Sequence, residues 1–141
     1  MPVVEGTAYW ASVLTPNVNY DPVYTVNLVV PDDVAQDFKD RGFTIKEMNE
    51  GPALVIKRKV NGAKGRINAA PELLDRAKQP INVSVGNGSR VKVMYKEWTS
   101  DYKGTTFKGL DFMKMQVLDL VEYGGVNEDF DIEADEELDE L

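Results

Sequence analysis

The chain has 141 residues, of which 24 are acidic and 16 are basic, and its formal net charge is −8. It contains no cysteine and no histidine, which excludes disulfides, thiol nucleophiles, histidine–metal sites and Ser–His triads. This length leaves room for one domain with its own core, and no apolar run approaches the roughly 20 residues of a membrane span. We therefore expect a soluble, cytoplasmic protein without a secretory signal, and not an enzyme.

The first third of the chain predicts two strands followed by a helix. Residues 7–14 combine aromatic and small side chains and end near Pro16, and residues 23–30 are strongly β-prone. Residues 31–33 (Pro-Asp-Asp) open a helix, because proline fits a first helical turn and acidic residues there complement the helix dipole. Gly42 ends this helix. In the second strand, alternate side chains form the expected core face: Tyr24, Val26, Leu28 and Val30.

The middle of the chain predicts more short strands and a second helix. Residues 43–46 and 53–60 are expected strands, and the Asn-Gly pair at 61–62 is the strongest turn signal in the chain. Residues 71–78 predict a short helix that starts at a proline. Residues 81–85 predict another strand.

The last third predicts a hairpin and a final strand. Residues 99–104 are the expected loop tip, residues 105–115 return with Gly109 as a bulge or kink, and residues 116–123 form a last apolar strand. Many short strands with glycines at the bends predict a small barrel or sandwich, mainly β. In residues 89–98, alternation places two sets of side chains on opposite strand faces: Arg90, Lys92, Met94, Lys96 and Trp98 on one, and Val91, Val93, Tyr95 and Glu97 on the other.

Charge is divided unevenly along the chain. Residues 127–141 carry nine acidic residues and no Lys or Arg, which leaves 15 acidic and 16 basic residues before them. We expect a folded domain of residues 1–126 and a flexible, disordered acidic tail of residues 127–141, because such a tail cannot form a packed core. The segment 57–114 holds thirteen basic and five acidic residues, with aromatic side chains among them. Cations interleaved with aromatic rings are typical of a groove for single-stranded nucleic acid.

The acidic tail is long enough to interact with its own domain. A flexible chain of 15 residues spans about 20 Å, so it can fold back over a cationic groove and compete with a polyanionic ligand. Four apolar side chains in it are expected anchors for a partner protein: Phe130, Ile132, Leu138 and Leu141.

Four segments, in this order and followed by the acidic end, resemble the single-stranded DNA-binding proteins of tailed bacteriophages. They are GTAYWASVLTP (6–16), YTVNLVVPDD (24–33), VSVGNGSRVKVMYKEW (83–98) and GLDFMKMQVLDLVEYGG (109–125). The resemblance covers nearly the whole chain. It implies an OB-fold-like five-stranded barrel with one or two short helices in an insertion, and a DNA groove built partly from residues 86–98 and 104–115. Some relatives end in an aromatic residue that contacts a polymerase, whereas this chain ends in Leu141.

We therefore predict a protein that coats and protects single-stranded DNA, with little sequence preference, in phage DNA replication, recombination and repair. No metal or other cofactor is expected, and the sequence is compatible with a homodimer without fixing the oligomeric state. The predicted phosphate contacts are Lys57, Arg58, Lys59, Lys64, Arg66, Arg90, Lys92, Lys96, Lys103 and Lys108, and the predicted stacking residues are Trp10, Trp98, Tyr102 and Phe107. Replisome proteins (polymerase, helicase or primase) are expected to bind the tail at Phe130, Asp135, Glu136, Glu137, Leu138, Asp139, Glu140 and Leu141.

Other interpretations remain open from the sequence. One is an RNA-binding OB-fold protein, and another is an interaction protein whose acidic tail mimics DNA to block a nuclease or repressor. A third treats the basic strands as a solvated sheet in which Tyr95 belongs to the core and Trp98 covers a sheet edge. A carboxylate pair for hydrolysis is the weakest alternative.

Overall fold

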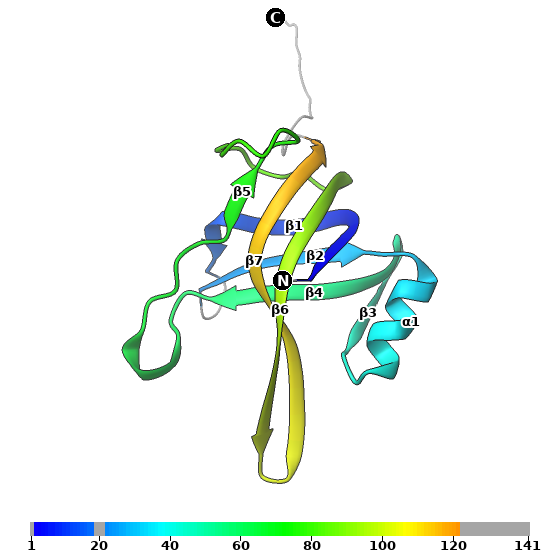
Figure 1. The fold of residues 1–141 in the computed structure, drawn as a ribbon, viewed down its shortest axis with the longest axis vertical. Coiled ribbons are helices and arrows are strands. Elements are labelled where there is room, and N and C mark those ends of the chain that lie inside the picture. Colours follow the sequence, from blue (N-terminus) through cyan, green and yellow to red (C-terminus); the bar gives the residue numbers. More distant parts are fainter. Residues whose placement is uncertain (1, 19–21, 122–141) are drawn as a thin grey trace, which may run out of the picture.

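Seven β-strands and one α-helix form the described part of the chain, which is residues 2–18 and 22–121 of a computed structural model (Figure 1). The helix α1 (Asp32–Asp40) follows the second strand, and a single 3₁₀ turn (Ala63–Gly65) lies after the fourth. Within these residues, no helix is both long and apolar enough to cross a membrane. The strands are β1 (Val3–Asn17), β2 (Val23–Val29), β3 (Ile45–Met48), β4 (Gly51–Lys59), β5 (Glu72–Leu74), β6 (Ser89–Tyr102) and β7 (Thr105–Asp119).

Five of the strands close into a barrel. β1 pairs antiparallel with both β2 and β6, β2 pairs with β4, and β6 pairs with β7 in a long hairpin. A parallel contact between β4 and β7, at Lys57 and Asp111, completes the ring. β3 extends the sheet beside β4, and β5 runs parallel to β7. This closed five-stranded arrangement is an OB-fold, which confirms the barrel predicted from the sequence.

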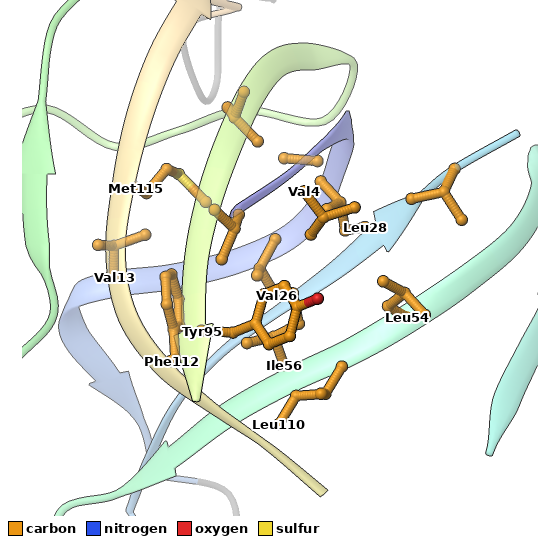
Figure 2. Packing of buried hydrophobic residues seen from close by; sticks show 14 of the residues in the cluster. Val4, Val13, Val26, Leu28, Leu54, Ile56, Tyr95, Leu110, Phe112 and Met115 are labelled. Atoms are coloured by element: carbon orange, nitrogen blue, oxygen red, sulfur yellow. The ribbon is translucent and has the colours of Figure 1, made fainter. Parts of the chain in front are cut away.

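The barrel interior is filled by alternate residues of its strands (Figure 2). On β2 the predicted core face is confirmed, because Tyr24, Val26, Leu28 and Val30 are all buried. On β6 the buried residues Val91, Val93 and Tyr95 alternate with outward-facing residues, again as predicted. Burial of such side chains contributes about 1.5–3 kcal/mol each to folding.

The helix α1 closes one end of the core. It begins after Pro31 and ends before Gly42, whose φ of +96° suits glycine, so both predicted boundaries are confirmed. Phe38 on its buried face packs against Phe43 and Tyr95, with ring centroids 5.6 and 5.8 Å apart. Burial raises the pKa of Tyr95, so its phenol stays neutral in the core.

The predicted helix at 71–78 is wrong. Its first residues form β5, where Leu73 is buried and the strand lies along β7, and a turn follows. The side chain of Asp75 accepts hydrogen bonds from the backbone N–H groups of Ala77 and Gln79, both at 2.9 Å. Asp side chains favour turns in this way, and here the turn replaces the helix.

The region around the hairpin also differs from the prediction. Residues 81–84 form no strand. Ile81 donates one backbone hydrogen bond to Leu73, and the segment then runs beside an open cleft toward β6. The hairpin is longer than expected: β6 continues to Tyr102, the tip is Lys103 and Gly104, and the predicted strands 105–115 and 116–123 are one strand, β7. Gly109 lies in regular pairing rather than in a kink, and the register shifts fall nearer the barrel.

Candidate nucleic-acid interface

The ends of β6 and β7 project from the barrel as a hairpin (Figure 1) that carries three aromatic rings on one face. The ladder pairs Trp98 with Gly109, Ser100 with Phe107, and Tyr102 with Thr105. Residues directly opposite each other share a face, as do alternate residues of one strand, so the three rings lie on the same side. The exposed fractions are 44% for Trp98, 62% for Tyr102 and 50% for Phe107. We call Trp98, Tyr102 and Phe107 the aromatic face.

Gly109 holds one ring of this face in place. A Cβ atom at Gly109 would collide with the indole of Trp98, so the ring lies directly over the glycine backbone. Covering a glycine with a cross-strand aromatic ring is a known way to stabilise a hairpin. The indole is therefore fixed on the strand while its other side stays open to a ligand.

The base of the hairpin is clamped to the end of α1. The guanidinium of Arg41 donates a hydrogen bond to Glu97 at 2.7 Å and one to Asp37 at 3.3 Å, and lies 4.6 Å from the ring centroid of Phe38. The bond to Glu97 is the main reason that the pKa of Arg41 is raised, so this arginine stays charged. On the other strand, Lys108 Nζ donates to the backbone oxygen of Arg41 at 2.6 Å. The hairpin is thereby tied to the core on the side away from the aromatic face.

Some of the predicted phosphate ligands are occupied within the protein. Arg58 makes two bonds of 3.0 Å to the carboxylate of Asp111, its side chain is 17% exposed, and the hydrogen bond to Asp111 raises its pKa. Arg90 donates to Glu5 at 2.9 Å. Arg58 and Arg90 thus join neighbouring strands, and Lys108 joins the hairpin to the end of α1, so the geometry favours a structural role for all three.

Seven other predicted cations are exposed and have no ion pair within the described residues, and five of them lie on β4, β6 or the hairpin tip. Lys57 on β4 and Lys96 on β6 are both ladder partners of Asp111 on β7, so the two lysines stand where these three strands meet. Trp98 follows two residues after Lys96 and lies on the same face of β6. The set continues along β4, β6 and the hairpin tip and comprises Lys57, Lys59, Lys92, Lys96 and Lys103, which we call the open lysines.

Three predicted site residues lie apart from this surface. Lys64 and Arg66 are in the loop that leaves the barrel after β4, on the side opposite α1 in Figure 1. Trp10 lies near the start of β6, since Ala8, two residues before it on β1, pairs with Ser89. Trp98 is nine residues further along β6, or about 30 Å of strand. The structure therefore brings together three of the four predicted stacking residues.

Sequence reasoning missed the residues that position the hairpin. Arg41 and Glu97 are 56 positions apart in the chain, and only the fold places them in contact. The single available signal was local, because Asp37 and Arg41 have the spacing of an ion pair on one helix face. The predicted tail contacts at residues 127–141 lie outside the described residues.

No protein-family model and no curated protein sequence matches the chain. Solved structures do match it. The crystal structure of gp2.5, a single-stranded DNA-binding protein encoded by bacteriophage T7, aligns with a TM-score of 0.64 at 15% identity, over 94% of this chain and 98% of that chain. The chain has the fold of a phage single-stranded DNA-binding protein. The resemblance predicted from the sequence is thus confirmed for the fold.

A second phage protein supports the same fold. The single-stranded DNA-binding protein of bacteriophage Enc34, solved in complex with single-stranded DNA, aligns with a TM-score of 0.52 at 12% identity, over 87% of this chain and 89% of that chain. Its C-terminally truncated form aligns with a TM-score of 0.55, over 86% of this chain. Identities this low show a shared fold, and the roles of individual residues rest on the geometry described above.

Proposed function

We propose that this protein binds and coats single-stranded DNA without sequence preference and is not an enzyme. The observation that carries the proposal is the aromatic face, which stands beside the open lysines on one outer surface of an OB-fold. The likeness to two phage single-stranded DNA-binding proteins, one of them solved with its DNA, supports it. Its place of action would be the cytoplasm of an infected host cell, during replication, recombination and repair of phage DNA.

The two parts of this surface have different tasks. Each base that stacks on Trp98, Tyr102 or Phe107 contributes about 1–3 kcal/mol, and any base serves because every base has a π-face. The open lysines neutralise phosphates and release counterions. Arg58 and Arg90 contribute indirectly, because they hold the strands on which the lysines stand.

A fluorescence titration tests this proposal. In a Trp10→Phe variant, Trp98 is the remaining indole, and a dT oligomer should quench its emission on stacking. With five open lysines in contact, log K should fall against log salt with a slope of roughly −3 to −4. An emission unaffected by excess oligomer at low salt would exclude the proposal.

RNA binding is the alternative that the same titration separates. OB-folds also bind RNA, and a protein that recognises the 2′-hydroxyl should prefer poly-rU to poly-dT. Stacking and phosphate contacts alone need no 2′-hydroxyl. We therefore expect poly-dT to bind at least as tightly as poly-rU.

We further propose that the acidic tail gates this surface and recruits replisome proteins. Residues 127–141 carry nine acidic side chains, and the open lysines offer the opposite charge. Removal of residues 127–141 should tighten DNA binding at low salt and change it little at high salt, because screening weakens the tail's competition. An affinity that is unchanged at every salt concentration would contradict the gating.

A further inference from the structure

A cleft on the barrel lies far from the aromatic face. It has a volume of about 460 Å³ and runs between the second half of β1 and residues 82–85. Trp10, at 63% exposure, stands at one end, and Leu14 and Val83 also expose apolar surface along it. We call this cleft the β1 slot.

One wall of the β1 slot is an unpaired strand edge. On one side β1 pairs with β2 as far as Asn17, but on the other side it pairs with β6 only through Ala8. Along residues 10–16 this second edge therefore has no strand partner within the described part of the chain. Such an edge is a template for an added extended segment, which binds through its main chain.

The chemistry of the slot favours a peptide over nucleic acid. Twelve residues line it, and none of them carries a charge: they are Trp10, Ala11, Ser12, Val13, Leu14, Thr15, Pro16, Asn17, Asn82, Val83, Ser84 and Val85. Nucleic-acid affinity comes largely from cations that neutralise phosphates, and this lining offers none. An uncharged extended segment is the complementary ligand.

The chain itself delivers such a segment to one end of the slot. The backbone oxygen of Val121 accepts a hydrogen bond from Gly86 at 2.7 Å, directly after the wall formed by residues 82–85. At the same end, the backbone N–H of Trp10 donates to Asn87 Oδ1 at 2.8 Å. The sequence after Glu122 is Tyr-Gly-Gly-Val-Asn (123–127), which has no charge, and the acidic residues begin at Glu128.

The lengths of slot and segment also agree. From Trp10 to Asn17 an extended strand covers about 23 Å, at roughly 3.3 Å per residue. The six residues 122–127 cover about 20 Å when extended. A chain that leaves Val121 along the slot therefore reaches the Asn17 end just where its acidic residues start.

We propose that residues 123–127 bind in the β1 slot as an additional strand beside β1. At the far end of the slot, Asn17 is opposite Val23, and Val23 is opposite Lys59. The docked segment lies on the opposite edge of β1, so three strand spacings, or about 14 Å, separate it from β4. The acidic tail then starts at the end of the barrel that carries Lys59 and Lys57. The docking itself is independent of DNA, and this last consequence alone rests on the proposed function.

Hydrogen exchange of the backbone amides of residues 11–15 tests the docking without any DNA. The full chain is compared with chains that end at residue 127 and at residue 121. We expect equal protection in the first two, and exchange at least about fivefold faster in the third. Equal exchange in all three chains overturns the proposal. Protection lost already at residue 127 also overturns it, because the acidic tail would then be the occupant.

Substitutions in the full chain give an independent measurement. In a Trp98→Phe variant, Trp10 is the remaining indole. The docked segment should cover Trp10, so its emission should be blue-shifted relative to that of an indole exposed to water. Tyr123→Asp with Val126→Asp should shift this emission to the red, whereas the matched pair Phe130→Asp and Ile132→Asp should leave it unchanged. A red shift in the matched pair overturns the proposal. So does a blue shift that fades on dilution, because a second copy would then supply the segment.

Discussion

Trp98 and Trp10 are both exposed indoles on strands of the same barrel, yet their surroundings are opposite. Trp98 lies over Gly109 on a projecting hairpin, shares its face with two further rings, and follows Lys96 on the same strand face. Trp10 stands at the end of an uncharged cleft, beside a strand edge that has no partner among the described residues. The comparison teaches that an exposed ring indicates a ligand, while the charges and backbone edges around it indicate which ligand.

The largest expected effect on DNA affinity distinguishes Trp98 from Trp10. Trp98→Ala removes a stacking platform and should cost about 1–3 kcal/mol of DNA affinity, which is roughly 5- to 150-fold. Trp10→Ala should change the affinity less than about twofold, because no open lysine lies at the β1 slot. Anisotropy of a labelled dT oligomer at one fixed salt concentration measures both. Equal losses in the two variants would place Trp10 in the DNA path.

The aromatic face could be predicted because its geometry follows from alternation. Once residues 89–98 are a strand, Lys96 and Trp98 must share a face, and a tight hairpin brings Phe107 to the same side. The β1 slot could not be predicted in this way. Residues 81–85 have strand composition, but the turn that follows them is pinned to β1 and to Val121, which holds the segment away from a partner.

Two neighbouring residues on β4 illustrate a second limit of prediction from the sequence. Lys57 and Arg58 look alike in the sequence, but they point to opposite faces of β4. Lys57 is exposed, while the guanidinium of Arg58 is bonded to Asp111, 53 positions away. A local pattern gives the face of a residue, and only the closed barrel gives its partner.

The second prediction uses this pair and has an intermediate effect. Lys57→Gln should reduce the slope of log K against log salt by about 0.7, one phosphate contact to a single strand, and leave stability almost unchanged. Arg58→Gln should keep the slope but lower the free energy of unfolding by about 1–3 kcal/mol, because Asp111 loses a bidentate partner. Urea unfolding and salt titrations measure the two quantities. The pattern would be contradicted by a slope that falls in Arg58→Gln alone.

The smallest expected effect concerns the clamp between α1 and the hairpin. Arg41→Met removes the bonds to Glu97 and Asp37 but no phosphate contact, since the clamp lies on the face opposite Trp98. A half-exposed ion pair contributes up to about 1 kcal/mol, so DNA affinity should fall about two- to fivefold with the salt slope unchanged. Lys39→Met is the matched control, because it removes the same charge from an exposed position on the same helix. It should alter neither quantity. If Arg41→Met instead lowered the slope by about 0.7, the guanidinium would be meeting DNA itself, and the hairpin would owe its position to the ladder alone.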